Sequence, residues 1–289
     1  MIDTLAQWVA AHPRLFVLTG AGISAGSGIP TYRDSAGVWR SHKPIQHQEF
    51  MRDSAARRRY WARSMGGWPP VARARPNGAH LALAELESMG RIEMLVTQNV
   101  DRLHQRAGSR TVIDLHGRLD RVQCLNCGQY TTRHAMQRDL MLANPALKTT
   151  KGPLRPDGDA DTGVDLDSFE VPPCRYCGGT LKPDVVFFGG NVPRPRVQNA
   201  LDALASSDAL LAVGSSLQVF SGYRFCRRAD ELGLPIAIIN PGQTRADPLA
   251  SLHVHAECEP VLSELVLKLR ATPVARRSRS PELLLQPGR

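Results

Sequence analysis

Six short runs of nearly continuous apolar residues alternate with helix-like segments, and this alternation restricts the fold more than any other feature of the sequence. Strands of a parallel sheet that is covered by helices on both sides have this composition, because both of their faces are buried. The runs are Leu15–Leu18, Ile92–Thr97, Thr111–Leu115, Val185–Phe188, Ala209–Val213 and Pro235–Ile239. Helical patterns such as His80–Met89 lie between them. We therefore predict an α/β protein with a Rossmann-like parallel sheet and helices on both faces.

Residues 120–182 interrupt this alternation, because they carry four cysteines and an acidic loop instead of a buried strand and helix. We predict that they form a small inserted module and that residues 1–119 and 183–270 together form the large domain. Residues 271–289 are rich in Arg, Ser and Pro, so we expect a basic, disordered tail.

The bulk properties restrict location and partners. The 289 residues carry a net charge of +9, partly in the tail and partly in a cluster at Arg57–Arg59. No nucleic-acid motif accompanies these charges, so we interpret them as solvated surface and expect no nucleic-acid partner. No apolar run approaches the ~20 residues that a membrane span needs, and no secretory signal is visible at the start. We therefore predict a cytoplasmic protein without a membrane anchor.

A glycine-rich turn follows the first apolar run directly. Gly20, Gly22 and Ala25 match the G-x-G-x-x-G/A spacing of dinucleotide folds, in which the backbone closely approaches a pyrophosphate. A dehydrogenase needs an acidic residue about 20 positions further on to hold the ribose, and Asp34 comes too early. The turn therefore predicts a dinucleotide site without the usual redox arrangement, with a purely structural turn as the alternative. Arg33 is a candidate for phosphate contact.

Polar side chains follow several of the other strands. Gln98, Asn99 and Asp101 come after one strand, and His116 after the next. A His at a strand end is a candidate general base because its pKa lies near neutral pH. The alternatives are a helix cap for Asn99 or Asp101 and a structural role for the His. Small hydrogen-bonding residues at the later strand ends are Gly214, Ser215, Ser216 and Asn240.

Two Cys-x-x-Cys pairs provide four thiolates in the inserted segment. They are Cys124 with Cys127 and Cys174 with Cys177. Tetrahedral ligation by four sulfurs suits zinc and leaves no open position, so we predict one structural Zn²⁺. Two reduced dithiols without metal are the alternative.

Taken together, these motifs resemble the sirtuin family over most of the chain, from about Leu15 to Cys258. Within that family the sequence is most similar to the class II branch, of the mitochondrial sirtuin-four type. The matching stretches are Gly20–Ser24, Gly28–Pro30 with Tyr32 and Arg33, Thr97–Asp101, Leu115–Gly117, both cysteine pairs, Leu181–Gly189, Gly214–Leu217 and Gln218–Phe225.

The resemblance implies an NAD-dependent protein-lysine deacylase that yields nicotinamide, 2′-O-acyl-ADP-ribose and free lysine. The acyl oxygen attacks C1′ of the nicotinamide ribose, and His116 acts as general base on the ribose hydroxyls; Asn99 is the second catalytic candidate. The substrate main chain is expected to add as a strand between Phe188–Gly189 and Gln218–Val219. The implied NAD-binding residues are Thr19, Gly20, Ala21, Gly22, Ile23, Ser24, Ala25, Tyr32, Arg33, Gln98, Asn99, Val100, Asp101, Gly214, Ser215, Ser216, Asn240, Pro241, Gly242 and Cys258.

The sequence departs from the family pattern at two positions, where Thr31 replaces an Asp and Gly190 replaces a Glu. Tyr60 and Arg63 have a spacing that binds carboxylated acyl chains in a related branch, so an acidic acyl group is one hypothesis. Transfer of ADP-ribose to protein and removal of lipoyl groups remain alternatives on the same fold. More distant alternatives are an NAD-dependent oxidoreductase and a zinc-ribbon binding module without catalysis.

Overall fold

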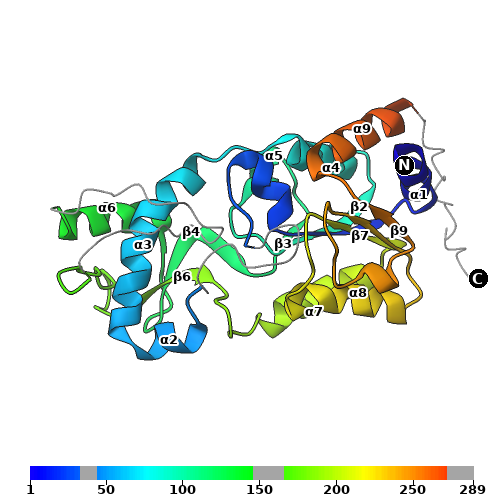
Figure 1. Ribbon diagram of the computed structural model, residues 1–289. Helices are drawn as coiled ribbons and strands as arrows, with labels where there is room; N and C mark the ends of the chain where they lie inside the picture. The colour runs from blue at the N-terminus through cyan, green and yellow to red at the C-terminus, as the bar shows by residue number, and fades with distance from the viewer. Residues whose placement is uncertain (33–43, 146–165, 272–289) are drawn as a thin grey trace, which may run out of the picture.

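A computed structural model of the chain describes residues 1–32, 44–145 and 166–271. Arg33, most of the acidic loop and the predicted tail from residue 272 onward lie outside these ranges. Figure 1 shows that β4, β6, α2, α3 and α6 occupy one end of an elongated molecule, and that the strands of the large sheet occupy the other. Among the described helices, none combines the length and the apolar composition that a membrane crossing requires.

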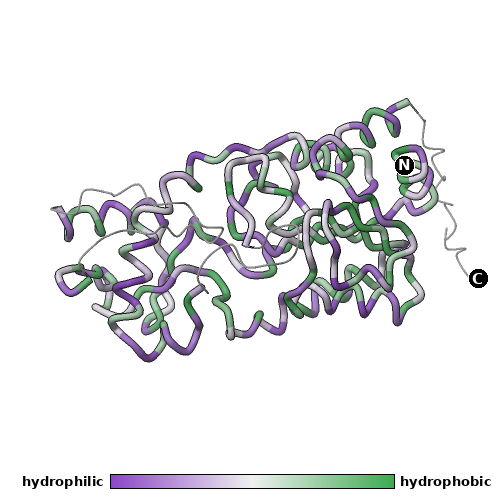
Figure 2. Tube along the Cα trace, in the orientation of Figure 1, coloured by the Kyte–Doolittle hydropathy of each residue, from purple (hydrophilic) through white to green (hydrophobic). Residues whose placement is uncertain are grey.

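The large sheet is parallel throughout and has the strand order β3-β2-β1-β7-β8-β9 within the described residues. Its strands are β1 (Leu15–Thr19), β2 (Ile92–Thr97), β3 (Val112–Asp114), β7 (Ala209–Val213), β8 (Ile236–Ile239) and β9 (Leu252–Val254). This arrangement confirms the predicted Rossmann-like α/β class. Figure 2 shows hydrophobic residues concentrated along these strands, as expected for strands that are covered on both faces.

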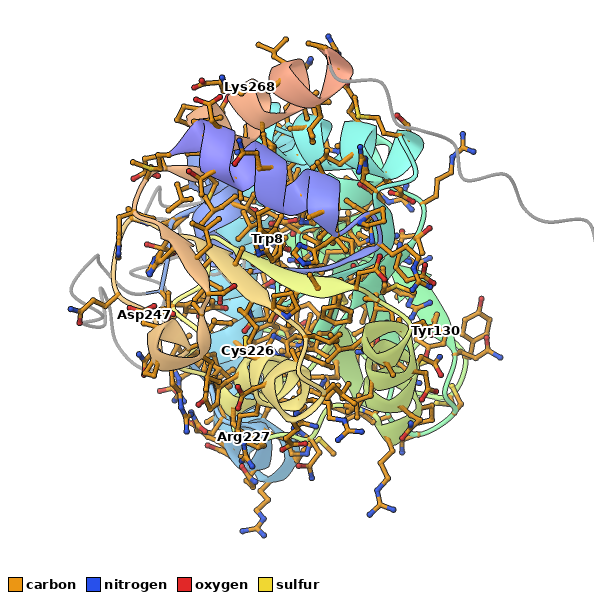
Figure 3. The ribbon with its side chains drawn as sticks, turned by 90° about the vertical axis from the view of Figure 1, so that its right-hand side faces the viewer. Trp8, Tyr130, Cys226, Arg227, Asp247 and Lys268 are labelled. Carbon is orange, nitrogen blue, oxygen red and sulfur yellow. The ribbon has the colours of Figure 1, made fainter. Side chains whose placement is uncertain are left out.

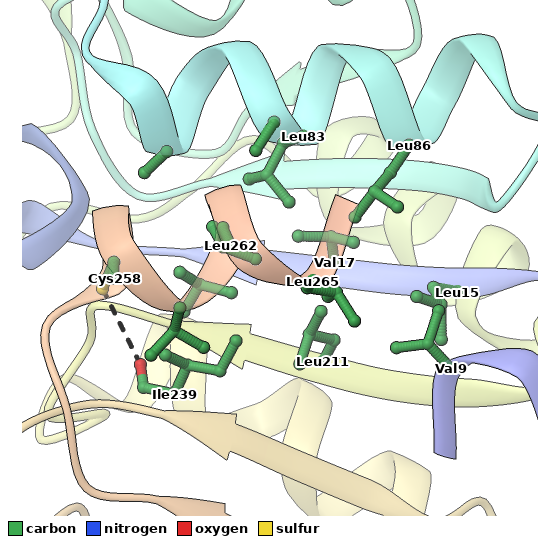
Figure 4. Close-up of a cluster of buried hydrophobic side chains, with 14 of the residues drawn as sticks. Val9, Leu15, Val17, Leu83, Leu86, Leu211, Ile239, Cys258, Leu262 and Leu265 are labelled. Carbon is green, nitrogen blue, oxygen red and sulfur yellow. Dashed lines mark hydrogen bonds between the residues drawn. The ribbon is translucent and has the colours of Figure 1, made fainter. Parts of the chain in front are cut away.

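Alternate residues of each strand point to opposite faces, so each face has its own core. On one face Leu15 and Val17 pack against helices α1 (Ile2–Ala11), α4 (Gly78–Ser88) and α9 (Cys258–Ala271), as Figure 4 shows. On the other face Phe16 and Leu18 pack against α7 (Arg194–Ala205) and α8 (Phe220–Glu231). The end-on view in Figure 3 shows the sheet between these layers, with Trp8 on one side and Cys226 on the other.

A second, antiparallel sheet has the strand order β5-β4-β6. Its strands are β4 (Gly117–Cys124), β5 (Tyr130–Thr132) and β6 (Leu181–Val185), and α6 (Arg133–Ala143) follows β5. The core beside this sheet also takes in Phe50 from α2 (His47–Arg52) and Trp61 from α3 (Ser54–Arg73). The module thus draws on residues that precede position 120; the predicted domain boundaries themselves stay a prediction.

The prediction of a parallel strand at Val185–Phe188 is wrong. Val185 ends β6 in the antiparallel sheet, and Val186 donates its N–H to the carbonyl of His116 at 2.8 Å. The run is apolar because Phe187 is buried in the core of the small module, and not because it forms a central strand. The remaining short elements are α5 (Leu103–Ala107) and the 3₁₀ turns at Ala21–Ser27 and Asp247–Leu249.

Candidate active site

A cleft of about 660 Å³ lies beyond the carboxyl ends of β1, β2, β7 and β8 and extends to the small module. Parallel sheets bind their ligands at this edge. The predicted site residues that line the cleft are Gly20, Ala21, Gly22, Ser24, Ala25, Tyr32, Gln98, Asn99, Val100, Asp101, His116, Gly214, Ser215, Ser216, Asn240, Pro241, Gly242 and Cys258. Thr19 and Ile23 are buried and do not line it, and Arg33 lies outside the described residues.

Glycines bring two strand ends into direct backbone contact at the base of the cleft. The N–H of Gly22 donates to the carbonyl of Gly214 at 2.8 Å. A Cβ on Gly22 would lie only 2.8 Å from that carbonyl oxygen, so a larger residue would push the strand ends apart. Gly214 also has a φ of +60°, which disfavours residues with a side chain. Glycine backbone without side chains therefore lines this part of the cleft, which allows a pyrophosphate to approach closely.

The turn after β1 continues as a 3₁₀ segment, Ala21–Ser27, where a dinucleotide fold would place an α-helix. Its Ser24 lies in a buried hydrogen-bond network. The Ser24 hydroxyl donates to Oδ2 of Asp101 at 2.7 Å and accepts from Nδ2 of Asn99 at 3.0 Å. Burial raises the pKa of Asp101. These three side chains are thereby held in fixed positions along one wall of the cleft.

Two buried histidines that the sequence analysis did not single out lie below this network. His80 and His104 are at most 1% exposed, and their ring centroids are 4.9 Å apart. Nε2 of His104 lies 2.9 Å from Oγ1 of Thr19, and Nε2 of His80 lies 3.5 Å from Oγ of Ser24. Burial lowers the pKa of His80 to about 4 and that of His104 well below its ordinary value. Both rings are therefore neutral near pH 7.

His116 stands where β3 leads into the small module. Its Nδ1 lies 2.9 Å from the carbonyl oxygen of Gln98, which accepts only, so Nδ1 carries the proton. Nε2 therefore carries the lone pair, and the hydroxyl of Ser221 lies 2.7 Å from it. Burial lowers the pKa of His116 to about 4; the bond to Gln98 opposes this shift, and the charges of Arg196 and Arg224 add to it. At neutral pH the ring presents an unprotonated nitrogen at the cleft.

Four thiols meet in the small module as the spacing of the cysteine pairs predicts. The sulfurs of Cys124, Cys127, Cys174 and Cys177 all lie within 4.8 Å of one another. The backbone N–H of Cys127 lies 3.5 Å from the Cys124 sulfur and favours its thiolate. This donor set fits a tetrahedral metal ion.

The two isolated cysteines have a different chemistry. Burial raises the pKa of both Cys226 and Cys258 to about 12, which makes them unreactive thiols at neutral pH. The Cys258 sulfur lies 3.9 Å from the carbonyl oxygen of Ile239, as Figure 4 shows.

The cleft also includes the residues at which substrate entry was expected. Phe188 and Gly189 line one part of it and Gln218 and Val219 another. Thr31 and Gly190, the two departures from the family pattern, line it as well. Tyr60 reaches the cleft, whereas Arg63 is not among the residues that line it. The hypothesis of an acidic acyl group therefore receives no support from the position of Arg63.

Comparison with known proteins gives a consistent set of similarities. A family model described as the Sir2 family matches residues 20–221. An NAD-dependent protein deacetylase 2 from Bradyrhizobium diazoefficiens is 55% identical over 265 residues, which cover 91% of this chain and 97% of that protein. The Drosophila melanogaster NAD-dependent protein deacylase Sirt4 is 47% identical over 91% of this chain and 86% of its own length. A solved complex of Sir2 with a p53 peptide and NAD⁺ superposes with a TM-score of 0.76 at 27% identity, covering 94% of this chain and 100% of that one.

Proposed function

Since the chain belongs to the Sir2 family, the sirtuins, and is an NAD-dependent protein deacylase, we propose that its cleft removes acyl groups from lysine side chains with His116 as the general base. The observation that carries this assignment is the state of His116. Its ring is neutral, its tautomer is fixed by Gln98, and Nε2 is the unprotonated, basic nitrogen of a ring that lines the cleft.

The residues present fit NAD. The backbone contact between Gly22 and Gly214 leaves the floor of the cleft open to a pyrophosphate, and Ser215 and Asn240 offer polar groups at neighbouring strand ends. When bound, NAD supplies an activated C1′ carbon whose bond to nicotinamide breaks as the acyl oxygen attacks. Asn99, Asp101 and Ser24 form a preorganised polar wall for that ribose.

The chain's own contribution to the chemistry is proton transfer. His116 accepts a proton from a ribose hydroxyl at Nε2, while Nδ1–H keeps its bond to the Gln98 carbonyl and so holds the ring in place. Phe187 and Phe188 line the cleft and give the acyl-lysine an apolar surface to pack against. The protein substrates are therefore acylated proteins, whose extended backbone we place between Gly189 and Gln218.

We further propose that the four-cysteine cluster holds one Zn²⁺ with a structural role. The support is the donor set: four sulfurs lie within 4.8 Å of one another, and among residues 1–32, 44–145 and 166–271 no His belongs to the group. We also propose a cytoplasmic location; in its support, none of the six cysteines, all of which lie in the described residues, forms a disulfide, and cysteines stay reduced in that compartment.

The test is His116→Ala in a nicotinamide-release assay with acetyl-lysine peptide, with product masses read alongside. We expect deacylation to fall by at least about 100-fold, the lower range for loss of a general base, while NAD affinity stays within about twofold. The mass of the product also distinguishes deacylation from ADP-ribosyl transfer. Near wild-type turnover in His116→Ala would remove that residue from its role.

A further inference from the structure

Ser221 makes a direct contact with the proposed base. Its Oγ lies 2.7 Å from Nε2 of His116, within the normal range for a hydrogen bond. Because Nδ1 donates to the Gln98 carbonyl, Nε2 accepts here and the Ser221 hydroxyl donates. Ser221 is not among the site residues predicted from the sequence.

The surrounding chain fixes this contact in place. Ser221 lies in the first turn of the twelve-residue helix α8, and the next residue is Gly222. A Cβ on Gly222 would lie 2.5 Å from Oε1 of Gln98, so the glycine allows the start of α8 to pack directly against that side chain. Gln98 in turn donates from Nε2 to Ser215 at 2.8 Å. The serine and the carbonyl that holds His116 are therefore positioned by the same packing.

Both partners of the contact face the cleft, since Ser221 and His116 both line it. We propose that Ser221 is a positioning residue for the general base: its hydroxyl holds the imidazole in a fixed orientation until a substrate hydroxyl takes its place as the donor to Nε2. This inference rests on the proposed role of His116 in deacylation.

A hydroxyl suits this task because it can form a hydrogen bond with both protonation states of the ring, as donor to the neutral form and as acceptor from the protonated form. Before reaction Ser221 donates to the lone pair on Nε2. When a substrate O–H donates to Nε2 instead, the serine hydroxyl turns about its Cβ–Oγ bond and releases the lone pair. The proton then moves to Nε2, the electron pair stays on the substrate oxygen, and the new Nε2–H donates to Oγ of Ser221. An alanine offers no partner in either state.

The experiment compares the wild type with Ser221→Ala, Ser221→Thr and His116→Ala. We expect Ser221→Ala to lower kcat about tenfold, the value of one hydrogen bond, with KM for NAD within about twofold of the wild type. Ser221→Thr keeps the hydroxyl and restores at least part of the lost kcat. Ser206→Ala is the control, because that serine is exposed just beyond the C-terminal end of α7 and its hydroxyl donates to the carbonyl of Asp202.

A second readout does not depend on turnover. In ¹⁵N-labelled protein, loss of the serine hydroxyl removes a hydrogen bond to Nε2, so the Nε2 resonance of His116 moves downfield in Ser221→Ala and stays near its wild-type position in Ser221→Thr. An unchanged Nε2 resonance, or an unchanged kcat beside an inactive His116→Ala, overturns the inference about Ser221. A wild-type protein that releases no nicotinamide refutes the proposed function instead, and the resonance still decides whether Ser221 bonds to His116.

Discussion

Acidification should destabilise the fold through the buried histidines, and His80 allows the effect to be calculated. Its side chain is fully buried between Asn77 and Ser24, and burial lowers its pKa from an ordinary 6.5 to about 4. The unfolded chain therefore binds a proton at this position below about pH 6.5, whereas the folded chain does so only below about pH 4. Stability thus decreases as the pH falls through this window and is constant, for this group, above it.

The magnitude follows from the two pKa values. Between pH 7 and pH 5, linkage at His80 alone lowers the free energy of unfolding by about 2 kcal/mol. His104 lies 4.9 Å away, is also buried, and changes stability in the same direction. A loss of this size is a large fraction of the 5–15 kcal/mol that typically separates folded and unfolded states.

Urea unfolding at pH 7 and pH 5 measures the effect, and His80→Gln isolates it. The variant is expected to be less stable than the wild type at pH 7, because it disturbs the cap of α4, but to lose about 2 kcal/mol less on going to pH 5. The loss of unfolding free energy between pH 7 and pH 5 is then compared between the two proteins. The contributions of the carboxylates and thiols that both proteins share cancel in this difference. Equal losses in the wild type and the variant would refute the reasoning.

Two further predictions concern the cleft floor and the metal. Gly214→Ala should weaken NAD binding at least about tenfold in a calorimetric titration, because its Cβ would collide with the backbone nitrogen of Ile23. Gly233→Ala, with a similar φ of +68° and open space around it, is the control; equal NAD affinity in the two variants would contradict the packing argument. Purified protein should contain about one zinc per chain, and Cys174→Ser should lose the metal and melt at a lower temperature. A metal-free wild type with the same thermal stability as Cys174→Ser would count against the zinc site.

The strands of the large sheet were predictable where burial on both faces produced an unbroken apolar run. Ala209–Val213 is completely buried and was located correctly. Val185–Phe188 has the same composition for another reason: it ends an antiparallel strand, fills the module's core and lines the cleft. β9 was not predicted, because a three-residue strand at the sheet edge that contains a His has no apolar signature. A local apolar pattern therefore indicates that a segment is buried, but it does not show which kind of strand the segment forms or what it packs against.

The residues of the candidate site divide in the same way, into those that a local sequence pattern predicts and those that it does not. The glycine turn and the cysteine pairs were recognisable because their chemistry depends on residues at fixed short spacings. His80, His104 and Ser221 act across separations of 56 to 105 residues, to Ser24, Thr19 and His116 respectively, so no local spacing reveals them. Their roles follow only from the fold, which brings the ends of distant strands together.

The fold also connects the metal cluster to the proposed base through one strand. β4 begins at Gly117, directly after His116, and ends at Cys124, a predicted zinc ligand. Gly117 has a φ of +86°, and a Cβ there would collide with the carbonyl oxygen of Asp184 on β6. The carbonyl of His116 accepts from Val186, just beyond β6. The pairing of β4 with β6 therefore fixes the backbone of the base. Since the four sulfurs lie near the opposite ends of these two strands, a metal ion bound there would stabilise the pairing that holds the backbone of His116.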